Sequence, residues 1–314
     1  MRVTANAFDS SLTSQLNVLT ARQYALQSQV SSGLKVAAPS DDPAAMANTL
    51  DYQAQNAAQT QYSSNISTLL SRAGSVYNVL QSLQTITSRA GEIATTVGGA
   101  TNQQSTLDNY ANEVNHLISQ VVTAANTKDP ATGQYLFGGT ASTTAPFTAT
   151  TDASGNVTGV TYSGNSTVNQ AQIGVGMTET ADIPGANTGS TGAHGLITDS
   201  QSGADLVNHL IALRNNLSSG NTTAITATDS ANLQKDQNNV AYQVANNGVV
   251  QSQLNVAATI ATNRSASLNT MISNTSSADL VQTMMQLSQT QTAYQAALQS
   301  GAKIMQLSIL NYIS

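Results

Sequence analysis

The sequence contains no cysteine and no tryptophan, and aromatic residues make up only 4% of its 314 residues. Without cysteine the chain can form neither a disulfide framework nor a cysteine-ligated metal site, and it has no thiol nucleophile. Aromatic side chains dominate thick globular cores, so their scarcity favours the packing of slender helices. We therefore expect a protein built mainly from paired and bundled helices.

Charge is also scarce, because charged residues make up 8% of the chain against roughly 25% in ordinary proteins. The net charge is -6 and no run of Lys or Arg occurs, which argues against a nucleic-acid partner, since such binding depends on contacts with phosphates. Gln, Asn, Ser and Thr supply the polarity instead. A weakly self-repelling surface of this kind suits a protein that polymerises.

No stretch reaches the ~20 apolar residues that a membrane span requires, so we expect no membrane partner. Residues 1–6 also lack the charged region and long apolar run of a cleaved secretion signal. If the protein is extracellular, we expect it to be exported by a route without signal cleavage.

Residues that could carry chemistry are few and scattered. The three histidines, His116, His194 and His209, have no carboxylate at metal-ligand spacing. Neither a G-x-S-x-G elbow nor a P-loop occurs. The sequence therefore predicts no catalytic, cofactor-binding or metal site, and we expect the protein not to be an enzyme.

Both ends of the chain carry apolar residues at alternating steps of four and three, the heptad pattern of packed helices. From Asp279 onward the only charged side chains are Asp279 and Lys303, so we expect the outer, Gln- and Ser-rich faces to contact neighbouring copies. We predict that the two terminal helices pair as a coiled coil and drive assembly. The expected pairing and assembly residues are Leu12, Leu16, Leu19, Leu26 and Val30 at one end, and Leu280, Met284, Leu287, Tyr294, Leu298, Met305 and Tyr312 at the other.

Between the ends, the run Pro39, Ser40, Asp41, Asp42 and Pro43 predicts a helix start. Asp42 is well placed as the N-cap, and proline is tolerated at the first helical position because its missing N–H has no helical partner there. Helical periodicity then extends to the pair of glycines at 98 and 99, and a further helix follows over 107–124.

Past residue 139 the pattern changes to period two with turn residues, which predicts a small antiparallel β unit, and helical spacing returns at about Leu206. Tyr135, Phe137 and Phe147 flank the change and are expected to pack at the domain junction. The expected fold is mainly α with a β insertion and is elongated. Its predicted parts are a terminal coiled-coil domain (1–42 with 273–314), a helical-bundle middle domain (43–139 with 203–272) and an outer β insertion domain (140–202).

Three segments of the sequence resemble the flagellin superfamily and, within it, the hook-associated proteins of the hook-filament junction. They are residues 27–36 with 39–45, residues 134–140 with 145–147, and residues 294–307. Flagellin itself usually has Asp-Asp-Ala-Ala-Gly at the helix cap, and Pro43 departs from that pattern toward the junction proteins.

The resemblance implies a structural adaptor of the bacterial flagellum, exported by the flagellar type III apparatus and located outside the cell. Its implied partners are its own copies in a ring or helical assembly, the first hook-associated protein, flagellin and a flagellar export chaperone. A flagellin filament subunit is the nearest alternative. From other classes, a secreted adhesin or a hydrolase would carry its activity on the β insertion, where Asp152, Glu179, Asp182 and His194 are too dispersed to be grouped by sequence.

Overall fold

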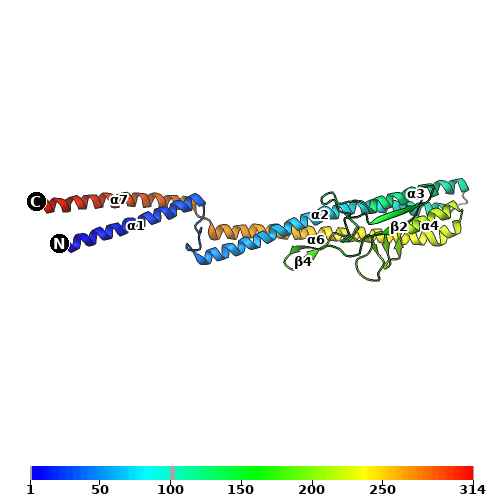
Figure 1. Cartoon of the computed structure of the whole chain (residues 1–314), viewed down its shortest axis with the longest axis horizontal. Helices are drawn as coiled ribbons and strands as arrows, with labels where there is room; N and C mark the ends of the chain where they lie inside the picture. Colours follow the sequence, from blue (N-terminus) through cyan, green and yellow to red (C-terminus); the bar gives the residue numbers. More distant parts are fainter. Residues whose placement is uncertain (1, 100–102, 314) are drawn as a thin grey trace. The chain divides into compact units, whose positions relative to one another are not determined.

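The structure, a computed structural model, describes the backbone of residues 2–99 and 103–313 and the side chains of residues 10–99 and 103–303. Long helices dominate it, as the sequence predicts (Figure 1). A one-turn helix α5 (Thr222–Ala224) and a π-helical turn η1 (Ile225–Asp229) lead into α6. The other helices are α1 (Arg2–Ser32), α2 (Pro43–Gly98), α3 (Gln104–Ala125), α4 (Leu206–Ser218), α6 (Ser230–Ser276) and α7 (Leu280–Ile313).

The chain divides into two compact units. Unit 1 comprises residues 1–59 and 263–314, and unit 2 comprises residues 60–262. Each unit is therefore made from segments far apart in the sequence. The finer division into terminal, middle and β insertion domains stays a prediction.

In unit 1, α1 and α7 run antiparallel and side by side, so that the two chain ends lie at the same end of the pair (Figure 1). The short connections beyond these helices also pair. Leu34 and Ser277 form an antiparallel bridge, the Lys35 amide donates to the Ser276 carbonyl at 2.8 Å, and the Ala278 amide donates to the Gly33 carbonyl at 2.8 Å. Gly33 has φ +71°, a conformation that glycine adopts without strain as a helix ends.

Two adjacent carboxylates organise the start of α2. The Oδ1 atom of Asp42 accepts from the amides of Ala44 at 3.0 Å and Ala45 at 2.9 Å, which satisfies two of the free N–H groups in the first turn. The Oδ2 atom of Asp41 accepts from the amides of Ala37 and Ala38. These backbone hydrogen bonds, that from Ala38 above all, hold the pKa of Asp41 below its ordinary value. The motif thus closes a tight loop and starts a helix.

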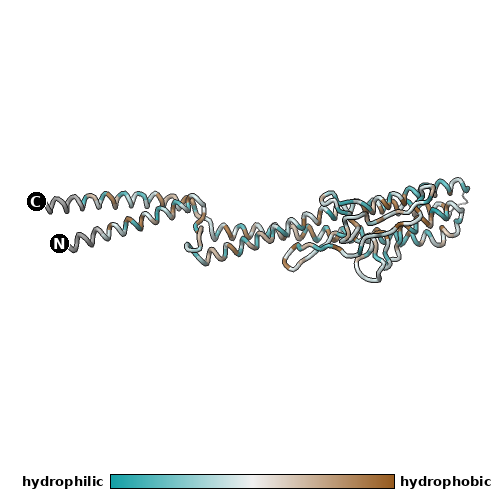
Figure 2. The backbone as a smooth tube through the Cα atoms, in the orientation of Figure 1, coloured by the Kyte–Doolittle hydropathy of each residue, from teal (hydrophilic) through white to brown (hydrophobic). Residues whose placement is uncertain are grey.

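In unit 2, residues of α2, α3, α4 and α6 meet in one hydrophobic cluster. Leu80, Leu83, Val114 and Leu213 are fully buried there. Figure 2 shows hydrophobic positions gathered where these helices run together, whereas the tube of α1 and α7 is mostly pale or hydrophilic. The expected helical bundle is therefore present, and its core lies in unit 2.

The predicted β insertion is present as three small sheets, in which most strand pairs are antiparallel. One sheet also contains a parallel pair, β5 with β6. Each sheet is too small to bury its own apolar face, so strand side chains such as Phe147 and Val157 join the helical core instead. The strands are β1 (Phe147–Thr151) with β2 (Val157–Tyr162), β3 (Ala171–Gly174) with β4 (Met177–Glu179), and β5 (Ala186–Asn187) with β6 (Thr198–Asp199) and β7 (Ala204–Asp205).

Within the described part of the chain, no helix is both long enough and apolar enough to span a membrane.

Candidate assembly surface

The α1 residues chosen from the heptad pattern lie on the side of the helix that is turned from solvent. Leu26 is only 6% exposed, and Leu12, Leu16, Leu19 and Val30 are half-buried. These residues recur along one face, and α7 is the helix against which α1 packs. That these five residues form the pairing and assembly face stays a prediction.

On α7, three of the predicted positions are more exposed than expected. Leu280, Met284 and Leu298 were expected to face α1, but they are 43%, 53% and 44% exposed. Leu287 and Tyr294 are half-buried as expected. Met305 and Tyr312 lie outside the residues whose side chains the structure describes. At the displaced positions the buried residue is therefore a neighbour of the predicted one, as Thr283 is of Met284, whereas Leu287 and Tyr294 lie on the expected side.

Small and hydroxylated residues occupy the inward positions that the prediction missed. Thr283 and Thr290 are 7% and 6% exposed, and each hydroxyl donates to the carbonyl four residues earlier at 2.7 Å. A buried threonine whose hydroxyl is satisfied in this way leaves no unpaired polar group.

Gly301 shows how closely the two helices approach. A Cβ atom built on it would lie 2.5 Å from Cδ2 of Leu12, well inside van der Waals contact. The absence of a side chain at 301 therefore gives Leu12 its space, and close approach takes precedence over burial of the largest apolar residues.

As a result, large apolar side chains remain on the surface of the pair. On α7, Val281 and Met285 are 70% and 55% exposed, and they lie beside the exposed Leu280 and Met284. On α1, Tyr24 is 70% exposed. Full burial of a side chain of this size stabilises a protein by roughly 1.5–3 kcal/mol, so unit 1 retains an unused capacity for apolar contact.

The three aromatic residues expected at the domain junction lie in unit 2. Phe137 and Phe147 are 0% and 4% exposed, and the ring of Phe147 lies 5.0 Å from that of Tyr162. Tyr135 is half-buried, with the Lys128 ammonium 4.8 Å from its ring centre. All three support the segment that connects α3 to the strands.

A buried arginine holds the same region together. The guanidinium of Arg72, on α2, forms ion pairs with Asp129 and Asp182, and its Nη2 donates to the Leu136 carbonyl at 3.3 Å. The side chains of Arg72, Asp129 and Asp182 are 10%, 2% and 4% exposed. Buried ions of this kind require partners because desolvation is costly. Neither the heptad spacing nor any sequence motif indicates this arginine.

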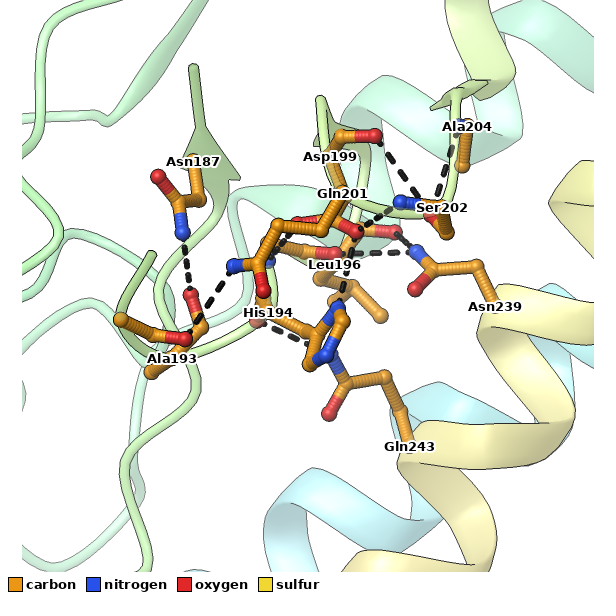
Figure 3. A network of polar contacts seen from close by, with 12 residues as sticks. Asn187, Ala193, His194, Leu196, Asp199, Gln201, Ser202, Ala204, Asn239 and Gln243 are labelled. Atoms are coloured by element: carbon orange, nitrogen blue, oxygen red, sulfur yellow. Dashed lines mark hydrogen bonds and ion pairs between the residues drawn. The ribbon is translucent and has the colours of Figure 1, made fainter. Parts of the chain in front are cut away.

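The loop before α4 is fixed by a polar network on α6 (Figure 3). Asp199 is fully buried, and its carboxylate lies 2.9 Å from Nδ1 of His194 and accepts from the Ser202 amide at 2.8 Å. Burial raises the pKa of Asp199, but the hydrogen bonds from His194 and Ser202 outweigh it, so its pKa lies below the ordinary value. From α6, Asn239 donates to the carbonyls of Gly195 and Leu196.

A second imidazole and carboxylate join α4 to α6. Nδ1 of His209 lies 2.8 Å from Oδ2 of Asp236, and the Asp205 amide donates to the same carboxylate at 2.9 Å. Burial lowers the pKa of His209, but the hydrogen bond to Asp236 and the charges of Asp236 and Asp205 outweigh it. The pKa of His209 therefore lies above its ordinary value.

The residues considered for a hydrolase are engaged separately. Asp152 accepts from its own turn at Ser154 and Asn156, Asp182 binds Arg72, and His194 binds Asp199. Among the described residues, no group of three or more His, Asp or Glu side chains is arranged to hold a metal ion.

Residues 3–142 match the family model described as the bacterial flagellin N-terminal helical region. No curated protein matches the chain. The resemblance to the flagellin superfamily that the sequence motifs indicate is thereby confirmed over this part of the chain.

Solved structures share the fold across most of the chain. A protein described as a flagellar hook-associated protein from Vibrio parahaemolyticus is 20% identical, with a TM-score of 0.62 over 76% of this chain and 100% of that one. FlgL from Bacillus cereus is 18% identical, with a TM-score of 0.56 over 71% and 99%. Flagellar hook associated protein-3 from Legionella pneumophila is 15% identical, with a TM-score of 0.56 over 70% and 98%. Likeness at these identities shows a common fold.

Proposed function

We propose that this chain is a structural adaptor of the bacterial flagellum that joins the hook-side junction protein to the flagellin filament. The fold shared with hook-associated proteins and the flagellin-like helical region at residues 3–142 support this role. Its partners would be its own copies, the first hook-associated protein and flagellin, with an export chaperone before assembly. It would act outside the cell after type III export.

The observation that carries the proposal is that α7 exposes large apolar side chains and buries small hydroxylated ones. Met284, Met285 and Val281 are 53–70% exposed, whereas Thr283 and Thr290 are buried. An isolated subunit gains nothing from this arrangement, because apolar area that stays in water contributes no hydrophobic stabilisation. A subunit that adds to an assembly buries that area against its neighbours, so the apolar surface that folding leaves exposed stabilises the polymer.

Deletion of the gene in a flagellated cell, followed by electron microscopy, tests the role. We expect hooks without attached filaments and free filament material in the medium. Hooks that still carry filaments would refute the junction assignment. Seeded polymerisation of the purified full chain separates the proposal from the filament-subunit alternative, because a flagellin alone should extend into long filaments.

A single substitution tests the surface itself. Met284→Lys places a charge on the exposed α7 face without disturbing the inward positions, so the monomer should keep its circular dichroism spectrum while hooks in complemented cells lack filaments. Gln289→Lys, at another exposed α7 position, adds the same charge without removing an apolar side chain. Comparison of the two variants separates the exposed apolar positions from the Gln- and Ser-rich face that the sequence predicts as the contact. Normal filament attachment with Met284→Lys would remove the exposed apolar positions from the interface.

A further inference from the structure

A row of exposed apolar side chains follows α6 within unit 2. Tyr242, Val249, Val256 and Ile260 are 49%, 54%, 58% and 59% exposed. Their steps of seven, seven and four residues keep them on one face of the helix. At 1.5 Å per residue this α6 stripe is about 27 Å long. Its periodicity is that of a helix that packs against another helix.

Tyr242, at one end of the α6 stripe, is held in place by the network of Figure 3. Its ring lies 4.7 Å from the His194 ring, and His194 is itself fixed by the buried Asp199 at 2.9 Å. Gln243, the next residue on α6, donates to the His194 carbonyl at 2.9 Å. An exposed tyrosine that is already ordered loses little entropy on binding, and tyrosine is a common anchor of protein interfaces.

A groove between α2 and α3 lies in the same unit. Its volume is about 860 Å³. Val79 and Ile86, which are 7% and 6% exposed, supply apolar lining. Ser82, Ser119 and Thr123 also line it, and short side chains of this kind let a third helix approach closely. From Ser75 to Ile86 the groove follows α2 for about 16 Å.

The scarcity of charge on the α6 stripe and in the groove indicates which kind of helix could bind to them. Residues 237–263, which include the whole α6 stripe, contain no charged side chain. Lys128 is the one lysine or arginine among the described lining residues of the groove, and none of them is a carboxylate. A helix with the usual density of charge would place unpaired ions against such surfaces. A helix as poor in charge as those of this chain would not.

We propose that the α6 stripe of one copy docks into the α2–α3 groove of a second copy of this chain. The two surfaces differ, so the contact is heterologous and repeats from copy to copy, which generates a ring or a helical array. This inference rests on the proposed function, because that function places many copies side by side. It adds a lateral contact in unit 2 to the contacts of the terminal helices.

Cysteine cross-linking tests the contact directly, because the natural sequence has no cysteine. Cells that lack the native gene would express two full-length variants together, Val249→Cys and Ser82→Cys. Mild oxidation of isolated flagella and a non-reducing gel should give a disulfide-linked dimer when both variants are present, and none with either alone. Adding Val256→Asp to the first variant should reduce the dimer at least about tenfold, because it would bury an unpaired carboxylate.

The matched control pairs Val249→Cys with Ser154→Cys, which lies in the exposed turn between β1 and β2 and should give no dimer. Dimers from Val249→Cys alone would indicate a symmetrical stripe-to-stripe contact and would overturn the inference. Flagella with attached filaments but no dimer from the stripe and groove pair would also overturn it and leave the proposed function intact. The deletion experiment tests that function independently.

Discussion

Units 1 and 2 bury opposite kinds of side chain. Between α1 and α7 the inward α7 positions include Thr283, Thr290 and Gly301, while larger apolar residues remain in water. In unit 2, Phe137 and Leu213 are fully buried. Hydrophobic burial stabilises a monomer only where it occurs within that monomer. Unit 2 therefore supplies most of the hydrophobic burial of the free subunit, and under the proposed function neighbouring copies would cover the apolar side chains that unit 1 leaves exposed.

Phe137→Ala should produce the largest loss of stability. The ring is 0% exposed in the core of unit 2, and removal of a buried phenylalanine costs about 3–5 kcal/mol in the free energy of unfolding. Urea denaturation followed by circular dichroism would measure it. Leu298→Ala in unit 1, where the side chain is 44% exposed, is the matched comparison and should leave the monomer almost unchanged. Equal losses would break the distinction between the units.

Arg72→Met should come next. The substitution leaves Asp129 and Asp182 buried without their cation, and breaking a buried ion pair by removal of one partner typically costs about 3–5 kcal/mol. Urea denaturation followed by circular dichroism would measure the loss. Arg89→Met, whose partners Glu92 and Glu113 have side chains that are 65% and 37% exposed, should have little effect.

Asp42→Ala should cause a smaller and more local loss of stability, at the start of α2. It removes two hydrogen bonds to the first turn, and loss of an N-cap typically costs ~1 kcal/mol. Because the change is local to unit 1, faster amide hydrogen exchange is expected at Ala44 and Ala45. Ser40→Ala is the control in the same loop. Unchanged exchange with Asp42→Ala would show that Pro43 alone sets the helix start.

Acidity should affect the contributions of His209 in unit 2 and Asp41 in unit 1 in opposite directions, and by the smallest amounts. The raised pKa of His209 means that its stabilising contribution is complete below an unfolded value of about 6.5 and is lost as the pH rises through the folded value. The lowered pKa of Asp41 means that its contribution is present above an unfolded value of about 3.9 and is lost as the pH falls through the folded value.

Hydrogen exchange can follow both regions in one sample. Raising the pH from 6 to 9 should loosen the first turn of α4, and His209→Asn should abolish that dependence. Lowering the pH below about 4 should instead expose the amides of Ala37 and Ala38, an effect that Asp41→Asn should remove. Exchange is corrected for its intrinsic pH dependence with unstructured peptides. A shared response of both regions would indicate global unfolding rather than these two groups.

Much of the helical architecture could be predicted because it depends on local signals. Asp42 and Pro43 start a helix through their own chemistry. The helix α2 ends at Gly98, at the pair of glycines where the sequence predicts its end. The paired terminal helices follow from heptad spacing, which brings Leu12, Leu19 and Leu26 onto one face. Spacing alone could also predict that a helical bundle follows, and the structure has one.

The burial of Thr283 in place of Met284 could not be predicted, because hydropathy ranks methionine above threonine. The choice between the two faces depends on how near Leu12 can come to Gly301, and on whether a hydroxyl finds a carbonyl on its own helix. Both are properties of the packed pair. The polar residues of α6, such as Asn239, were missed for the same reason, since their partners are loop carbonyls more than forty residues earlier.

The sequence by itself determined the helices, their caps, the pairing of the chain ends and the resemblance to flagellin, because each depends on residues close together or on a repeating pattern. Only the tertiary structure decided which apolar side chains remain exposed after folding. Burial of the small residues on α7 leaves the large ones exposed, and the fixed loop at His194 orders Tyr242 on α6. The surfaces available for assembly consist of apolar side chains that the fold leaves exposed, so they can be identified only from the packed structure.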